Sequence, residues 1–276
     1  MLTKAEVRAV ASLRAKPDRD RLGLFVIEGD KLVREALALG CGVESIYAEG
    51  AWIAATSPGS GTARTVEVSA EDLRRLSTLK TPNGALAVVR RPHPVLDWDA
   101  IASNLVLVLD AVQDPGNLGS LLRVAAWFGI TDVVASPDCA DAFSPKVVQG
   151  SMGALFHVRV HSLPIVPFAA EARSRGLPVY AAALHGDSLY EVDLGALGLV
   201  LFGNESSGLS EELLGLASQR LVIPAWNGSG PGRDSLNVAA AAAVVCSEFR
   251  RRAAPGGRRT CGQPGPSGRS TMAGAG

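Results

Sequence analysis

The stretch Asp114-Pro115-Gly116-Asn117-Leu118-Gly119 follows an apolar run at 105–109 and opens a helical pattern. Two similar polar clusters follow further along the chain: Gly203-Asn204-Glu205-Ser206-Ser207-Gly208-Leu209, and Ile223-Pro224 with Ser235-Leu236-Asn237-Val238. A strand that ends in Gly and Asn and leads into a helix places backbone N–H groups at the edge of the sheet. That edge is where open α/β sheets bind ligands. Three such clusters in one half of the chain predict one shared site.

Around these clusters, apolar strand-like runs alternate with helical patterns. We expect strands at 105–109, 132–135, 157–160, 179–183, 199–202 and 220–223, and helices at 118–128, 144–154, 167–175, 210–216 and 238–251. Strands of continuous apolar character separated by helices are typical of a parallel sheet that is covered on both faces. The sequence therefore predicts an α/β fold with a largely parallel sheet.

The beginning of the chain has its own α/β alternation. We expect a helix at 2–15, strands at 24–27, 43–48 and 85–89, a helix that Asp30 caps, and a helix at 70–77 that Ser69 caps. The Arg90-Arg91-Pro92-His93-Pro94 tract suits neither a helix nor a strand interior. These patterns predict a small α/β domain at 1–90, a linker at 91–103 and a larger domain at 104–253.

Residues 254–276 are rich in Gly, Pro and Arg and have almost no large apolar side chain. Such a composition predicts a disordered basic tail. A solubilising role for this tail is favoured over that of an RNA-contacting arm.

Composition excludes several classes of protein. The net charge is +0 over 276 residues, so contact with nucleic acid requires a local basic patch. The four cysteines and four histidines are scattered without metal-ligand spacing, and we expect no metal site. Charged residues at the N-terminus and the absence of a long apolar stretch predict a cytoplasmic protein without membrane segments. Dinucleotide, P-loop and serine-nucleophile motifs are also missing from the sequence.

Four residues in or near the first two clusters have specific candidate roles. Arg123 lies off the apolar stripe of its helix and, by our prediction, near the helix N-terminus, where a cation is disfavoured unless an anion binds nearby. An anion-binding or catalytic role is therefore favoured over a surface salt bridge. Asn117 suits helix capping and function equally well. Glu205 suits a turn cap, an orienting partner for Arg123 or a ligand contact, and Gly203 without a Cβ permits a close ligand approach.

The order N-x-G-x-x-x-R, then G-N-E-x-x-G-L, then I-P followed by S-L-N-V resembles the three signature motifs of the SpoU-type RNA 2′-O-ribose methyltransferases, of the SPOUT superfamily. The resemblance covers about residues 105–251. The tract E-G-D-K-L-V-R-E-A-L at 28–37 is similar to the small RNA-binding domain of this family, which is of the ribosomal L30e type.

The resemblance implies a C-terminal trefoil knot, a homodimer and S-adenosylmethionine as the cofactor. It places Gly203, Ile223 and Leu236 against the cofactor, and it places Asn117, Arg123, Glu205, Ser235 and Asn237 at catalytic or RNA-positioning sites. Three features depart from the family pattern: Ala225-Trp226 where Met is usual after Ile-Pro, a long Gly-rich loop before Ser235, and Asp234 in place of Glu.

The resemblance thus implies methylation of a ribose 2′-hydroxyl in structured RNA. Ribosomal RNA is favoured over transfer RNA because shape recognition of folded RNA needs a separate docking surface. One alternative is a non-catalytic RNA-binding or ribosome-assembly factor with the same fold, but the motif positions are intact. Another is a small-molecule methyltransferase, which would need neither the first domain nor the basic residues Lys4, Arg8, Arg14, Lys16 and Arg19.

Overall fold

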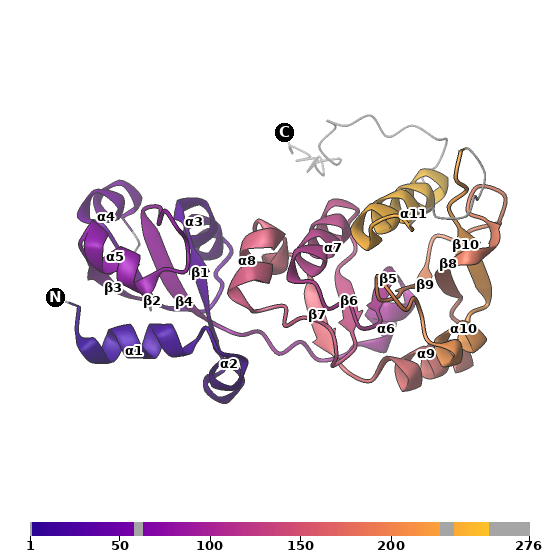
Figure 1. Cartoon of the computed structure of the whole chain (residues 1–276), viewed down its shortest axis with the longest axis horizontal. Helices are drawn as coiled ribbons and strands as arrows, with labels where there is room; N and C mark the ends of the chain where they lie inside the picture. The colour runs from indigo at the N-terminus through magenta and orange to yellow at the C-terminus, as the bar shows by residue number, and fades with distance from the viewer. Residues whose placement is uncertain (1, 58–62, 227–234, 254–276) are drawn as a thin grey trace, which may run out of the picture.

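A computed structural model describes residues 2–57, 63–226 and 235–253. Two β-sheets lie side by side in the molecule, each with its own helices (Figure 1). The predicted tail at 254–276 and most of the Gly-rich loop before Ser235 lie outside the described residues.

The first sheet is mixed and has the strand order β1-β4-β2-β3. Its strands are β1 (Leu24–Glu28), β2 (Val43–Ala48), β3 (Arg64–Glu67) and β4 (Ala85–Arg90), and its helices are α1 (Lys4–Ser12), α2 (Lys16–Leu22), α3 (Asp30–Ala38), α4 (Gly50–Thr56) and α5 (Ala70–Leu76). The strand β4 pairs antiparallel with both β1 and β2, whereas β2 and β3 are parallel. Side chains of α1 and α5 pack on one face of this sheet.

Several predictions for this part of the chain need correction. The helices α2 and α4 and the strand β3 were not predicted, and all three are short elements with a weak apolar period. Asp30 does not cap its helix, because Gly29 holds the cap position. The Asp30 carboxylate instead accepts hydrogen bonds from Arg34 and Trp52. Ser69 does cap α5, since its hydroxyl accepts from the backbone N–H of Asp72.

The predicted linker at 91–103 is partly helical. It contains α6 (Trp98–Ala102), in which Ile101 is buried and the Trp98 ring stacks on Phe168. The linker prediction missed this helix because Pro92 and Pro94 dominate the local pattern, whereas Asp97 caps the helix that follows them.

The second sheet has the order β10-β8-β9-β5-β6-β7, and each adjacent pair of these described strands is parallel. Its strands are β5 (Leu105–Leu109), β6 (Asp132–Ala135), β7 (Arg159–Ser162), β8 (Val179–Ser188), β9 (Gly198–Phe202) and β10 (Gln219–Val222). The helices of this half, besides α6, are α7 (Pro115–Trp127), α8 (Pro145–Ser151), η1 (Ala154–Phe156), α9 (Ile165–Ser174), α10 (Glu211–Leu216) and α11 (Val238–Ala253). The predicted parallel α/β fold is confirmed.

Alternating strand residues build a separate core on each face of the parallel sheet. On one face Leu107 and Val200 pack with α7, α8 and α11, and on the other Val106 and Leu201 pack with α6, α9 and α10 (Figure 1). The first of these cores continues into the first sheet, because Phe25 belongs to the same cluster. The two sheets therefore share one hydrophobic core.

Polar contacts also fix the junction between the two halves. The guanidinium of Arg19 is buried and donates to the Asp141 carboxylate at 2.6 and 2.9 Å. The ring of Phe143 packs edge-on against Phe25, and Gln149 donates to the backbone carbonyl of Glu28. Arg19 was grouped above with the basic residues that an RNA-binding domain would need. That grouping is wrong for Arg19, because its guanidinium is buried and its charge is neutralised by Asp141.

The last helix is held at its C-terminal end. Arg252 donates to the backbone carbonyls of Leu189 and Tyr190, and Glu248 accepts from both Arg251 and Arg252. These hydrogen bonds, Arg251 first, lower the pKa of Glu248 to about 2. The trefoil knot stays a prediction, since the loop between β10 and α11 contains residues outside the described ranges. No described helix has the length and apolar character needed to cross a membrane.

We predict that Gly119→Ala destabilises the fold, because α7 and α8 touch at Gly119 and Gly150. A Cβ at Gly119 would lie 2.9 Å from the Gly150 carbonyl carbon, so the helices would have to move apart. The expected loss of unfolding free energy is about 1–3 kcal/mol in urea titrations. Gly215→Ala in α10 is the control, because its Cβ would meet nothing within 4 Å. Equal stabilities of the two variants would contradict this packing account.

Candidate active site

The three polar clusters meet at the carboxyl edge of the parallel sheet. The strands β5 and β9 are neighbours, and the backbone N–H of Asp110 donates to the carbonyl of Phe202 where both strands end. The loops that follow them carry Asn117 and Glu205, and the third cluster precedes α11, which packs against α7. The fold therefore gathers Glu205 and Asn237 around Asn117, from which they are 88 and 120 residues away in the sequence.

Asn117 is the third residue of α7 and not its cap, which corrects one of the two roles predicted for it. The cap is Asp114, whose carboxylate accepts from the backbone N–H of Asn117 at 2.8 Å. Pro115 at the first helical position needs no hydrogen-bond acceptor. Since Asp114 satisfies the helix end, the Asn117 side chain remains available for other contacts.

The Asn117 amide joins the other two clusters. Its Nδ2 donates to Oε1 of Glu205 at 2.5 Å, and its Oδ1 accepts from Nδ2 of Asn237 at 2.8 Å. An amide is suited to this position because it offers a donor and an acceptor on one planar group. Residues from all three predicted clusters thus form one hydrogen-bonded chain of side chains, hereafter the Asn237–Asn117–Glu205 chain.

The loop that carries Glu205 is held by Asn204. Its side-chain oxygen accepts from the backbone N–H groups of Ser206 and Ser207, and its Nδ2 donates to the carbonyl of Ala111. The backbones of Asn204 and Gly208 pair across the turn. A Cβ at Gly203 would lie 2.2 Å from the Gly208 carbonyl carbon. The missing side chain of Gly203 therefore permits the tight turn, and our expectation that it also lets a ligand approach the backbone closely stays a prediction.

The loop after β5 contains strain that sequence reasoning did not find. Ala111 has a φ of 50°, which is rare for a residue with a Cβ. Its N–H donates to the Ser136 hydroxyl and its carbonyl accepts from Asn204, so both backbone groups are fixed from outside. The Cys139 thiol accepts from the N–H of Val112, and burial raises its pKa. This thiol therefore supports the loop in its protonated form.

The third cluster begins the last helix. The side-chain oxygen of Asn237 accepts from the N–H groups of Ala239 and Ala240, so Asn237 caps α11 with its oxygen and holds Asn117 with its nitrogen. Ser235 is exposed and makes no side-chain hydrogen bond to another described residue. Leu236 is 54% exposed, which is unusual for a leucine beside a polar site.

Arg123 lies outside the Asn237–Asn117–Glu205 chain. It is the ninth of 13 residues in α7, so the expectation that it lies near the helix N-terminus is wrong. The stripe beside it is buried as predicted, through Leu118, Leu121, Leu122 and Ala125, and Arg123 itself is exposed. Within the described residues its guanidinium has no hydrogen-bond or salt-bridge partner. A free cation two turns from the amide chain can bind an anion.

Gly203, Ile223 and Leu236 provide groups that suit a purine-like ring. Their backbone N–H groups have no acceptor within the described part of the chain. Ile223 is half-buried and Leu236 exposes much of its apolar side chain. Apolar surface with a few free backbone donors is the usual composition of a small-molecule site. The described residues contain no group of three or more His, Cys, Asp or Glu placed to hold a metal ion.

Comparison with known proteins assigns this arrangement to a class. Residues 104–247 match the model of the SpoU rRNA Methylase family, and residues 4–87 match that of an MRM3-like substrate binding domain. The chain therefore belongs to the SpoU rRNA methylase family. It is 30% identical to the 23S rRNA (guanosine(2553)-2'-O)-methyltransferase of Bacillus subtilis, over 89% of this chain and 96% of that relative.

Two solved structures are similar over nearly the whole chain. One is a protein of the TrmH family of RNA methyltransferases from Porphyromonas gingivalis, with 41% identity, a TM-score of 0.81 and coverage of 91% of this chain and 99% of that one. The other is the AdoMet-bound rRNA methyltransferase of Sinorhizobium meliloti, with 28% identity, a TM-score of 0.81 and coverage of 92% and 97%.

We predict that substitutions of Asn237 separate its two roles. Asn237→Ala removes the cap and the donor to Asn117, and should lower the unfolding free energy by about 1 kcal/mol. Asn237→Asp keeps an acceptor for the cap, so its stability should stay near that of the wild type. It leaves the Asn117 amide between two carboxylates, which only accept hydrogen bonds, so the Asn117 oxygen loses its donor. Both variants should lose methyl transfer in a radiolabel assay; an active Asn237→Asp enzyme would contradict a role for the side-chain chain.

Proposed function

We propose that this protein transfers the methyl group of S-adenosylmethionine to a ribose 2′-hydroxyl of ribosomal RNA. The observation that carries the proposal is the Asn237–Asn117–Glu205 chain, which joins residues of all three family motifs at one sheet edge. The relatives support the choice of substrate: the Bacillus subtilis relative is named as a 23S rRNA 2'-O-methyltransferase, and other relatives are named as mitochondrial rRNA methyltransferases.

S-adenosylmethionine would supply an activated methyl group on a sulfonium. Gly203, Ile223 and Leu236 would hold it, through backbone donors toward the adenine and apolar side chains against its ring. The Sinorhizobium meliloti relative is described as AdoMet-bound, which supports this assignment. The three residues lie on the three segments next to the side-chain chain, so a bound cofactor would lie beside Asn117.

The polar side chains would position the ribose. Asn117 is held by Glu205 on one side and Asn237 on the other, so its amide cannot rotate freely. A fixed amide can orient a hydroxyl for in-line attack, and holding the reacting atoms in line provides much of the rate enhancement in such reactions. The exposed Ser235 would contact the RNA. Arginine side chains stay protonated in proteins, so they do not serve as bases. We therefore propose that Arg123 binds the RNA phosphate and stabilises the negative charge that develops on the 2′-oxygen.

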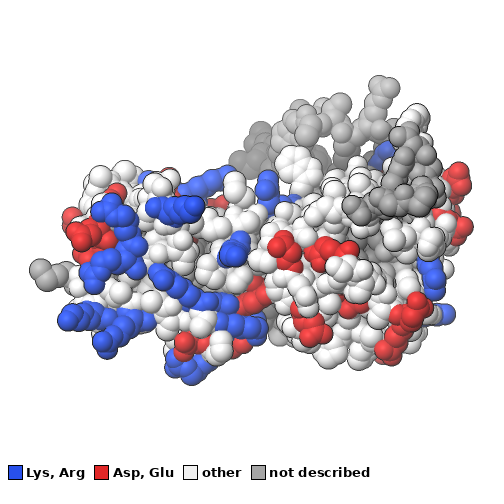
Figure 2. All heavy atoms as spheres, in the orientation of Figure 1, with Lys and Arg blue, Asp and Glu red and all other residues white. Residues whose placement is uncertain are grey.

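The first half of the chain would dock the RNA. The protein is neutral overall, but residues 1–91 have 14 Lys and Arg against 11 Asp and Glu, whereas residues 104–253 have 10 against 14. Figure 2 shows Lys and Arg gathered over the first half and Asp and Glu over the second. Lys4, Arg8 and Lys16 are exposed there. The buried Arg19–Asp141 pair would keep this basic surface at a fixed distance from the site.

The active form would be a homodimer of this chain. It would be located in the cytoplasm. Trp127 at the end of α7 is 81% exposed, and large exposed aromatic side chains mark interaction surfaces. Sedimentation equilibrium at micromolar concentration should give a dimer for the wild type and a monomer for Trp127→Lys. A monomeric wild type would contradict the dimer.

The proposal predicts methylated ribose in unmodified large-subunit rRNA after incubation with the enzyme and labelled S-adenosylmethionine. Nucleoside analysis should place the label on the 2′-oxygen. Arg123→Ala should lower kcat by about 100-fold or more, as expected for the loss of a group that stabilises developing charge. Its folding and cofactor affinity should persist, and Arg175→Ala on the opposite sheet face is the control.

Three results would contradict the proposal. Label on a base would exclude ribose methylation. Cofactor binding without transfer to any RNA would favour the non-catalytic RNA-binding factor. Full activity of Arg123→Ala would show that its exposed guanidinium has no part in the reaction.

A further inference from the structure

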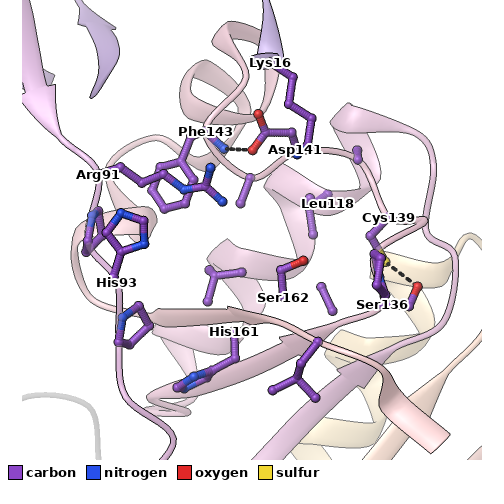
Figure 3. Close-up of a pocket in the computed structure, with 18 of the residues that line it drawn as sticks. Lys16, Arg91, His93, Leu118, Ser136, Cys139, Asp141, Phe143, His161 and Ser162 are labelled. Atoms are coloured by element: carbon purple, nitrogen blue, oxygen red, sulfur yellow. Dashed lines mark hydrogen bonds between the residues drawn. The ribbon is translucent and has the colours of Figure 1, made fainter. Parts of the chain in front are cut away.

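A cavity of about 330 Å³ lies at the junction of the two halves, outside the side-chain chain (Figure 3). Its walls come from α2, from the segment after β4, from the loop after β6 and from the end of β7. Figure 3 shows Ser162 near the middle of the opening, Arg91 and His93 on one side, and Ser136 and Cys139 on the other. The volume is within the usual range for small-molecule pockets.

The walls combine apolar surface with free polar groups. Leu118 and Phe143 are buried residues that line the cavity. The guanidinium of Arg91 lies 4.7 Å from the centroid of the Phe143 ring, which gives the wall a flat cationic surface. The Ser162 hydroxyl and the His93 imidazole have no hydrogen-bond partner within the described residues. Such a pocket suits a planar ring that carries hydrogen-bonding groups.

The rim of the cavity is positively charged. Lys16 and Arg91 both pair with the Asp20 carboxylate, so one negative charge is shared by two cations. The other carboxylate, Asp141, is neutralised by the buried Arg19 and also accepts from the N–H of Phe143. An anionic group at the rim would therefore be favoured. Cationic rim and flat wall together fit the phosphate and base of one nucleotide.

The cavity is close to the proposed methylation site. Leu118 lines it, while the neighbouring Asn117 faces Glu205 and Asn237. The loop that forms its wall is bonded to the loop after β5, through Ser136 to Ala111 and through Ala140 to Val112. The first turn of α7 therefore separates the two sites, and one RNA strand can reach both.

We propose that this cavity binds a second, unpaired nucleotide of the substrate RNA, next to the one that is methylated. This inference rests on the proposed function. RNA-binding proteins read sequence mainly from splayed bases, which stack on aromatic rings or Arg planes and hydrogen-bond at their edges. The Arg91–Phe143 surface would stack the base, Ser162 and His93 would bond its edge, and Lys16 would meet the phosphate. The cavity thus contributes to the choice of target.

The test fills the cavity without touching the methylation site. Ser162→Phe places a ring at an exposed position at the end of β7, and His93→Ala removes an exposed side chain. Ser162→Phe should raise the KM for the rRNA transcript by about 10-fold, a typical effect of losing one stacked base. His93→Ala, which removes one hydrogen bond at the base edge, should raise it by a smaller factor. The kcat, S-adenosylmethionine affinity and melting temperature should change little. Ser174→Phe, exposed on α9, is the matched control.

Photocrosslinking provides a readout that needs no methyl transfer. A transcript containing 4-thiouridine should crosslink to the peptide around Ser162 in the wild type, and the crosslink should disappear in Ser162→Phe. Crosslinks elsewhere, or an unchanged KM in folded Ser162→Phe, would overturn the inference. The proposed function would still stand if the protein transfers methyl groups to the RNA. A crosslink at Ser162 in a protein that transfers no methyl group would instead overturn the proposed function. Competition by millimolar nucleoside monophosphate without any RNA crosslink would also overturn the inference, since the cavity would then serve free nucleotides.

Discussion

The site depends on one amide whose donor and acceptor are both in use. Asn117 can hold Glu205 and Asn237 together only because Asp114 satisfies the helix end in its place. A carboxylate at this position could not serve both neighbours because it lacks the donor, and a hydrocarbon lacks both donor and acceptor. The polar loops of three distant chain segments are therefore fixed relative to one another by two hydrogen bonds, and the groups around them take their positions from that arrangement.

The parallel sheet makes this contact available. Parallel strands end at a common edge, so the loops after the neighbouring strands β5 and β9 meet there, and α11 brings Asn237 to them by packing against α7. Close backbone packing at Gly119 lets α7 lie against α8, and the missing Cβ of Gly203 permits the tight turn at 203–209. The shared hydrophobic core and the buried Arg19–Asp141 pair then hold the basic first half against this edge. A rigid junction gives both the proposed docking surface and the cavity a constant geometry.

Much of this was predictable from residue patterns, and the failures have physical causes. The strands β2, β5 and β6 begin and end where predicted, because continuous apolar runs with turn residues at both ends leave little choice of boundary. The grouping of Asn117, Glu205 and Asn237 followed from the position of each after a strand. The capping role of Asp114 was missed because Asn and Asp are equally good caps, and only the position of Pro115 in the helix decides between them. The strain at Ala111 and the burial of Arg19 depend on partners more than twenty residues away, so no local pattern reveals them.

The central claim is that Asn117 and Glu205 act as one unit in methyl transfer. A double-mutant cycle with Asn117→Ala, Glu205→Ala and the double variant tests it, with kcat/KM for an rRNA transcript as the readout and S-adenosylmethionine affinity as the control. The account predicts that the double variant loses little more activity than either single variant, because each change already breaks the same hydrogen bond. Losses that multiply, so that the two residues contribute independently, would contradict it.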